Sequence, residues 1–302
     1  MININRILCP VDFFPASEKA VHYAAGMAAI YGASVHLLHA VTPVIATAYE
    51  FPMDTSAITK SMVEASSVEM KKVASKVKAR GIKVDTDIRV GTVHEVISRA
   101  ISRIRPDLIA MGTHGRTGID RWFLGSVTEW LMRESPVPVL ALSAKERLRS
   151  PAFRRILVTT DFSHGTKDAL NYAFSIAQEN KSQITLLHVV HDVGMDVSAK
   201  YRDSIVQGVG DKLENFIPDE AWDWCEVQAK VEVGHPYRMI ERTLDKERPD
   251  LLVMNIHGKG MLDRALLGST AERLVRSAMC PVLLIPPMTK AKRKARPGGR
   301  AA

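Results

Sequence analysis

Residues 111–128 read Met-Gly-Thr-His-Gly-Arg-Thr-Gly-Ile-Asp-Arg-Trp-Phe-Leu-Gly-Ser-Val-Thr, and this stretch decides the fold. An apolar run at 107–111 leads into it and predicts a buried strand, while residues 126–133 predict a helix directly after it. Two glycines therefore follow the end of a strand, and a Gly-Ser pair opens a helix. This arrangement is typical of a loop that holds a phosphate in a parallel α/β protein.

Five residues supply the chemistry of this loop. Gly112 and Gly115 have no Cβ, so they allow backbone angles and approach distances that other residues would block. Gly125 and Ser126 place N–H donors, a hydroxyl and the positive end of a dipole at the start of a helix. Arg116 adds a charge-assisted hydrogen bond to a phosphate. The alternative is that the glycines only shape a tight connection. No Walker A sequence occurs in the chain, so the P-loop NTPase class is set aside.

Predicted strands and helices alternate along the first half of the chain. The apolar patterns predict strands at 6–12, 34–41, 82–90, 107–111 and 137–142, and helices at 17–31, 55–80, 93–104 and 126–133. This alternation predicts an α/β fold, with an open parallel five-stranded sheet flanked by helices in a Rossmann-like arrangement. Ligands of such sheets bind outside the carboxyl ends of the strands, so Asp12 and Ala40 are expected to face the same crevice as the loop.

The pattern then restarts, which predicts a second copy of the fold. Five short motifs recur in the same order, the early ones at an offset of 149 residues and the later ones at 143. Among them are Arg-Ile-Leu at 6 and 155, Asp-Phe at 12 and 161, and Leu-Gly-Ser at 124 and 267. A tandem duplication explains this order. The predicted domains are 1–145 and 152–288, and a basic disordered tail is predicted at 289–302.

The composition excludes several classes of protein. The chain has 302 residues and a net charge of +8, but six of its 41 basic residues lie in the last thirteen positions. Without that tail the balance is 35 basic against 33 acidic residues, so the folded part gives little reason to expect a nucleic-acid partner. Three scattered cysteines fit a reducing compartment, and no apolar run is long enough to span a membrane. These features predict a cytoplasmic protein.

A family resemblance accounts for the loop and its flanks together. A Gly-x-x-Gly, nine residues and Gly-Ser/Thr after a strand resemble the ATP-binding signature of the universal stress protein family. The Pro-x-Asp end of the first strand, Leu-Leu-His at the end of the second and Pro-Val in the last strand match as well. The resemblance covers both halves, as in tandem members of the family. It implies an adenine nucleotide alpha hydrolase-like fold.

The resemblance also implies where a nucleotide binds in the first half. Residues matching Asp12 and Ala40 contact the adenine and ribose, and the glycine-rich positions surround the phosphates. The predicted ATP-binding set of the first domain is Asp12, Ala40, Met111, Gly112, Gly115, Arg116, Gly125, Ser126 and Val127. The cofactor is predicted to be ATP, and whether Mg²⁺ or Mn²⁺ accompanies it stays open.

The second half departs from the pattern at one position, where Asn255 replaces the first glycine. Asparagine tolerates left-handed backbone angles, but its side chain occupies space where a glycine backbone would meet the ligand. We therefore predict a weaker or altered second site, formed by Asp161, Val189, Asn255, Gly258, Gly268, Ser269 and Thr270.

Other candidate residues receive structural interpretations. His39 and His188 recur at the ends of equivalent strands, where a lone histidine is more often structural than catalytic. Trp222 and Trp224 are expected on one face of the second half's third strand or of its approach. The spacing of histidines and cysteines indicates no metal site.

Three functions remain open from the sequence. The favoured one is a nucleotide-binding regulator that responds to stress or energy status. The second is slow ATP hydrolysis or adenylate kinase-like phosphoryl transfer, which needs positioned charge and a metal holder, and only Asp12, Arg116 and Ser126 are evident for it. The third is a non-nucleotide or lipid-binding scaffold. In proteins that the chain resembles, the last strands pair between subunits, so residues 137–142 and 281–285 predict an intramolecular pseudo-dimer that can pair again into a homodimer.

Overall fold

The structure is a computed structural model of the chain. It describes residues 2–44, 55–113, 124–143, 145–146, 151–163, 165–191, 199–219, 221–256 and 268–286. The predicted tail at 289–302 lies outside these residues, as do three of the predicted site residues, Gly115, Arg116 and Gly258.

The chain divides into two compact units. The first unit comprises Asn3–Leu131 and Leu140–Ala144, and the second comprises Met1–Ile2, Met132–Val139 and Lys145–Ala302. Each unit holds one copy of the repeat, and each is described by itself below. The domain boundaries predicted at residues 145 and 152 stay a prediction, because the segment Met132–Val139 groups with the second unit.

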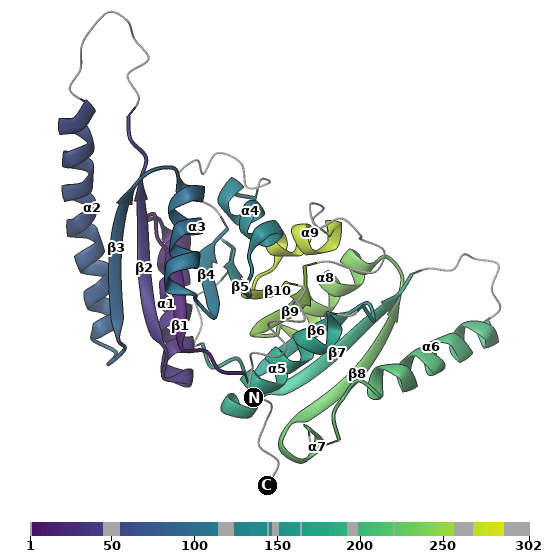
Figure 1. Ribbon diagram of the computed structural model, residues 1–302. Coiled ribbons are helices and arrows are strands. Elements are labelled where there is room, and N and C mark those ends of the chain that lie inside the picture. The colour runs from purple at the N-terminus through teal and green to yellow at the C-terminus, as the bar shows by residue number, and fades with distance from the viewer. Residues whose placement is uncertain are drawn as a thin grey trace, which may run out of the picture. The chain divides into compact units, whose positions relative to one another are not determined.

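The first copy alternates strands and helices as the sequence predicts. Its elements are β1 (Arg6–Pro10), α1 (Pro15–Tyr31), β2 (Ser34–Val41), α2 (Thr55–Lys78), β3 (Val84–Val90), α3 (Val93–Ile104), β4 (Leu108–Gly112), α4 (Ser126–Glu134) and β5 (Val139–Leu142). The strand order is β3-β2-β1-β4-β5, and β1 pairs in parallel with both β2 and β4 (Figure 1). The predicted open, parallel α/β sheet is confirmed.

The second copy repeats this topology with one extra helix. Its elements are β6 (Arg155–Thr160), α5 (Thr166–Asn180), β7 (Gln183–Val190), α6 (Ala199–Glu214), α7 (Ala221–Trp224), β8 (Glu226–Val233), α8 (Pro236–Glu247), β9 (Leu251–Asn255), α9 (Ser269–Ser277) and β10 (Val282–Ile285). The order β10-β9-β6-β7-β8 is again parallel throughout. The tryptophans lie on the short helix α7, which directly precedes β8 and is the approach to that strand. Because this segment is helical, the period-two argument for one shared face does not apply, and Trp222 is 51% exposed.

The central strands are apolar because both faces of the sheet are covered. Ile7, Leu8 and Cys9 on β1 and Leu108 and Ile109 on β4 are fully buried. Helices α1 and α2 pack on one side of the strands and touch each other, while α3 contacts β1 and β2. Strands covered on both faces have continuous apolar runs and not alternating ones, which is the pattern of these segments.

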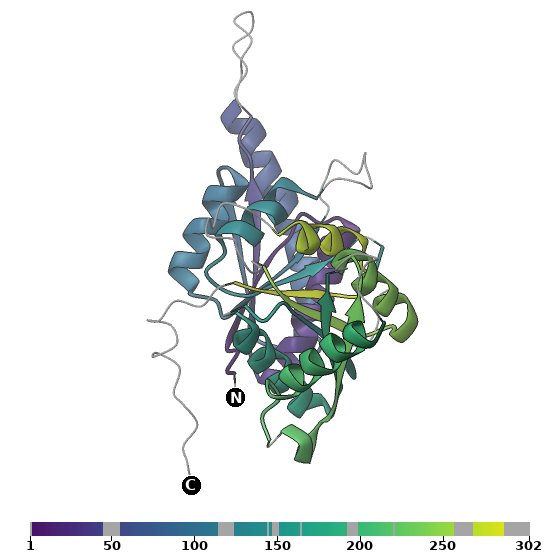
Figure 2. The same cartoon turned by 90° about the vertical axis from the view of Figure 1, so that its right-hand side faces the viewer.

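Helix α2 packs along only part of its length. Its buried residues are all in the C-terminal half, from Met70 to Val77. The N-terminal turns project past the end of β3, as Figures 1 and 2 show. This end of the helix reaches the carboxyl edge of the sheet and carries Ser66 toward it.

The strand order reverses direction between β1 and β4, and in the second copy between β6 and β9. Open α/β sheets bind ligands at such a reversal, outside the carboxyl ends of the strands. The topology therefore gives each unit one position at which a site is expected. Among the described residues, no helix has both the length and the apolar character that crossing a membrane requires.

Candidate functional site

A recess of about 550 Å³ opens at the reversal point of the first unit. The ends of β1, β2 and β4 form its floor, and α3 and the start of α4 form its walls. Val93 and Ile97 from α3, with Leu38 and Met111 from the strands, make one side apolar. The volume is within the range of ligand pockets, about 300–1,000 Å³.

The structure brings the predicted residues of the first domain together. Every one of them that belongs to the described part of the chain lines this recess: Asp12, Ala40, Met111, Gly112, Gly125, Ser126 and Val127. The fold also adds residues that sequence reasoning missed, namely Ser17, Thr42, Ser66, Thr113 and Thr128. Their hydroxyls come from five different segments, and only the folded topology makes them neighbours.

Asp12 shapes the turn that follows β1. Its Oδ1 accepts a hydrogen bond from the Phe14 N–H at 3.1 Å, which is an Asx turn. The residue between them, Phe13, has a φ of 67° in the left-handed region. A bulky residue there costs about 1–3 kcal/mol, so the turn must be held by its surroundings. Asp12 is therefore both a wall of the recess and the support of its own turn.

The turn is repeated in the second unit. Asp161 Oδ1 accepts from the Ser163 N–H at 3.0 Å, and Phe162 between them has a φ of 59°. Strained backbone of this kind is concentrated at functional sites. Its presence at the same place in both copies marks the two recesses as equivalent.

The recurring histidines support these turns. The His39 Nδ1 lies 2.7 Å from the carbonyl oxygen of Val11, and the ring lies 4.5 Å from that of Phe13. A carbonyl oxygen only accepts, so Nδ1 carries the proton in this bond. His188 repeats both contacts, at 2.8 Å to the carbonyl oxygen of Thr160 and 4.3 Å to the Phe162 ring. These contacts agree with the structural interpretation of both histidines, although both rings also line their recess.

Gly112 is explained by packing. It is not among the glycines with positive φ, so unusual backbone angles are not the reason for it. A Cβ on Gly112 would lie 2.6 Å from the Ala16 carbonyl carbon, at the start of α1. Close packing therefore accounts for this glycine, because its missing Cβ lets α1 sit directly against the end of β4.

The start of α4 places backbone N–H groups beside the recess. The first helical bond runs from the Glu129 N–H to the Gly125 carbonyl oxygen at 3.0 Å, so the N–H groups of residues 126–128 precede it. The Gly125 N–H donates to the Thr113 carbonyl oxygen at 2.9 Å, and the Thr128 hydroxyl donates to the Gly112 carbonyl oxygen at 3.3 Å. These two bonds fix the helix end beside β4, and such an end can hold an anion.

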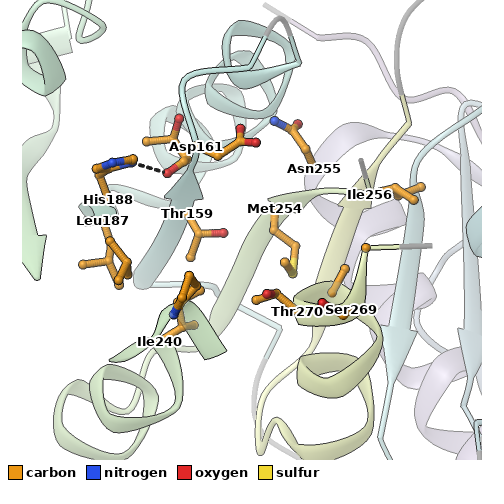
Figure 3. A pocket seen from close by; sticks show the side chains of 15 residues that line it. Thr159, Asp161, Leu187, His188, Ile240, Met254, Asn255, Ile256, Ser269 and Thr270 are labelled. Atoms are coloured by element: carbon orange, nitrogen blue, oxygen red, sulfur yellow. Dashed lines mark hydrogen bonds between the residues drawn. The ribbon is translucent and has the colours of Figure 1, made fainter. Parts of the chain in front are cut away.

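The second unit has an equivalent but smaller recess of about 280 Å³, shown in Figure 3. The predicted residues within the described part of the chain all line it: Asp161, Val189, Asn255, Gly268, Ser269 and Thr270. Helix α9 begins at the N-cap Gly268 without a side-chain cap. Met254 and Ile240 provide an apolar side, as in the first unit.

Several substitutions distinguish the two recesses. Val189 takes the place of Ala40 and adds two methyl groups to the strand end. Pro236 stands where the first unit has Val93, at the start of the helix that forms the wall. Thr270 replaces Val127 and adds a hydroxyl at the start of α9. The second recess therefore differs in both size and polarity.

The reason given above for Asn255 needs correction. Its φ is not positive, since it ends β9 in strand conformation. Its side chain points toward the turn that holds Asp161 and away from Met254, Ser269 and Thr270 (Figure 3). With the amide oriented to satisfy both groups, it contacts the start of α5 and not the middle of the recess. An altered second site remains a prediction. Steric obstruction of the recess by the Asn255 side chain does not support it.

The three cysteines and His36 on β2 do not line either recess. Burial raises the pKa of the Cys9 thiol far above its ordinary value, and it raises the pKa of Cys225 to about 11. Neither thiol is an activated nucleophile. Within the described ranges, no three or more His, Cys, Asp or Glu side chains are grouped as ligands for a metal ion.

Comparisons with known proteins agree with the repeat. A model of the universal stress protein family matches residues 3–143 and again 152–286. A universal stress protein of Mycolicibacterium smegmatis is 25% identical over 293 residues, covering 93% of this chain and 97% of the relative. One of Mycobacterium tuberculosis strain H37Rv is 26% identical over 299 residues, covering 92% and 95%. Among solved structures, a universal stress protein from Archaeoglobus fulgidus matches with a TM-score of 0.69 and 25% identity, covering 95% of this chain and 97% of that one.

Proposed function

The chain is a tandem member of the universal stress protein family, and we propose that its first recess binds ATP so that the protein acts as a regulatory nucleotide sensor in the stress response. One observation carries the proposal. The residues that the sequence motif predicts around ATP, as far as they are described, line a single recess of about 550 Å³. We place the protein in the cytoplasm on the same family grounds.

The residues of the recess fit the parts of a nucleotide. The apolar side formed by Val93, Ile97 and Met111 suits the faces of an adenine ring. Asp12 lies where a carboxylate can accept hydrogen bonds from ribose hydroxyls. The N–H groups at the start of α4, which precede its first helical bond, suit the phosphates because they combine donors with the positive end of the helix dipole. When bound, Mg²⁺ or Mn²⁺ would neutralise phosphate charge there.

A filled-recess variant tests the proposal. Ala40→Phe places a ring in the first recess, and we expect ATP affinity to fall at least about tenfold, since overpacking and lost contact together exceed about 1.4 kcal/mol. Val189→Phe makes the equivalent change in the second unit and is the matched control, which should leave the tighter site unchanged. Calorimetric titration of the full chain with ATP gives both values, and circular dichroism confirms that each variant is folded. Equal losses in the two variants would contradict the assignment.

The same samples separate a sensor from the alternatives. Intact ATP recovered from the complex after long incubation supports a sensor. Release of ADP that Asp12→Asn abolishes supports slow hydrolysis or phosphoryl transfer at this site. Asparagine is the right replacement because its side-chain oxygen preserves the acceptor for the Phe14 N–H, which alanine would remove. Absence of any nucleotide binding would favour the scaffold interpretation.

A further inference from the structure

The two copies of the repeat differ by a paired exchange at one contact between helix and strand. The first copy has Ala16 at the start of α1 and Gly112 at the end of β4. The second copy has Gly165 at the position of Ala16 and Asn255 at the position of Gly112. The small residue thus changes sides: it is on the strand in one copy and on the helix in the other.

The contact in the second copy is also tight, although it is less close than the 2.6 Å contact in the first. A Cβ added to Gly165 would lie 3.0 Å from both Cγ and Oδ1 of Asn255. Gly165 has a φ of −75° and a ψ of −15°, which any residue adopts. Space, and not backbone angle, therefore requires this glycine. The Asn255 side chain fills the volume that a methyl group at position 165 would occupy.

Asn255 also satisfies the backbone at the start of α5. Its Nδ2 donates to the Gly165 carbonyl oxygen at 3.0 Å, and its Oδ1 accepts from the Thr166 N–H at 3.1 Å. The amide end also lies 3.4 Å from the Ser163 hydroxyl. The N-cap residue Gly165 has no side chain, and the Thr166 N–H also donates to the Ser163 carbonyl oxygen at 3.1 Å. Here the cap comes from a neighbouring strand.

The contacts of Asn255 extend to the turn that holds Asp161, the acidic residue of the second recess. The turn that Asn255 holds contains Ser163, whose N–H donates to Asp161 Oδ1 at 3.0 Å. Thr160 and Thr166 close the other side of this turn with a buried hydroxyl pair at 2.8 Å. The strained Phe162 lies within it.

We infer that Asn255 is a positioning residue, which holds the turn of Asp161 from the edge of the second recess and leaves that recess open to a ligand. The two glycine-containing pairs are then alternative solutions to the same packing problem. This inference concerns the turn itself, and only its consequence for ATP rests on the proposed function.

Hydrogen exchange at single amides of the full chain tests the inference. Asn255→Ala removes one of the two acceptors of the Thr166 N–H and loosens the turn that supplies the other, so we expect this amide to exchange about fivefold faster or more, the factor that a lost cap corresponds to. Asn255→Asp keeps an acceptor for this N–H but loses the donor to the Gly165 carbonyl oxygen, so its exchange rate should lie between those of the original chain and of Asn255→Ala. A general loss of stability would speed exchange across the second unit, including residues 251–255, and would not be reversed by aspartate. An unchanged Thr166 rate in Asn255→Ala would overturn the inference.

A double-mutant cycle provides a second test that does not depend on any ligand. Gly165→Ala alone and Asn255→Gly alone should each lower the melting temperature of the second unit, by a clash and by a lost cap respectively. The double variant recreates the small-residue arrangement of the first unit. Its decrease in melting temperature should therefore be smaller than the sum of the two single decreases. Additive decreases in melting temperature would contradict the interpretation that the two residue pairs are alternative packing solutions.

Titration of these variants with ATP then shows what the turn does for binding. If Asn255 positions Asp161, Asn255→Ala weakens the second site. Tighter binding after Asn255→Gly would instead mean that the side chain obstructs the recess, and would overturn the inference. If no nucleotide binds either unit, the proposed function fails, while the exchange rates and the melting temperatures still decide the role of Asn255.

Discussion

Glycines that look alike in the sequence have different effects on stability. Gly112 has the backbone of Ala16 within 2.6 Å of where its Cβ would be, whereas Gly210 on α6 has nothing within 4 Å. We expect Gly112→Ala to lower the free energy of unfolding by about 1–3 kcal/mol, because the helix must shift. Gly210→Ala should raise it by about 0.5–1 kcal/mol, because alanine favours a helix. Urea unfolding measures both, and a neutral Gly112→Ala would show that α1 moves without cost.

His36 on β2 predicts how stability depends on pH. Burial lowers its pKa from 6.5, and the proximity of Asp87, whose Oδ2 lies 3.9 Å from Nε2, offsets this only in part. Asp85 acts in the same direction as Asp87, while Arg103 and Arg89 oppose protonation of the ring. The unfolded chain therefore binds the proton first as pH falls.

The stability that depends on a neutral His36 ring is fully present above pH 6.5. It declines as the pH falls toward the lower pKa of the folded state. We expect His36→Gln to flatten the stability profile between about pH 5 and 7, where a histidine titrates. Urea unfolding at a series of pH values checks this, with His191→Gln as an exposed-surface control. An unchanged slope in His36→Gln would assign the dependence to other groups.

Which site residues the sequence can predict depends on how far away their partners are. Asp12, Gly125 and Ser126 follow from local motifs, because a turn and a helix start are made by neighbours in the chain. The reason for Gly112 does not follow from a local motif, since Ala16 contacts it only after α1 packs on β4. The orientation of Asn255 is hidden in the same way, because its partners lie at the start of another helix.

At the scale of elements, caps determine how well the bounds are predicted. Helix α3 has the predicted limits, 93–104, since Thr92 caps it and Arg105 ends it in the left-handed region before a proline. Helix α1 starts earlier than predicted, at Pro15, because proline at the first turn is already helical. The helix α7 was missed because its four residues are too few to show a period.

The cap of α3 links an element to the recess. The Thr92 hydroxyl accepts from the Glu95 N–H at 3.4 Å, and this helix supplies Val93 and Ile97 to the recess wall. We expect Thr92→Ala to cost about 1 kcal/mol of stability and to weaken ATP binding in the first unit. His235→Ala is the matched control, since α8 begins there without a side-chain cap. Thermal unfolding and ATP titration give the two readouts, and equal effects of the two variants would exclude the cap as the cause.

At the scale of the whole molecule, duplication gives one chain two copies of a site that can diverge. The recesses keep the same turn, the same histidine and the same helix start, while their volumes differ by about half. The pairing of the last strands into a pseudo-dimer, and of two chains into a homodimer, stays a prediction. Light scattering of the full chain measures the number of copies directly.

Unequal recesses predict unequal stabilisation by ligand. ATP at about 100 times its dissociation constant adds about 2.7 kcal/mol to the unit that binds it, and little to a unit whose site is far from saturation. We therefore expect ATP to slow hydrogen exchange in β1 and β4 more than in β6 and β9, which are the equivalent strands of the second unit. Ala40→Phe should remove the protection of β1 and β4, and Val189→Phe should not. Equal protection of both pairs of strands would mean that the substitutions around the second recess preserve its affinity, and that the duplicated sites have not diverged in binding.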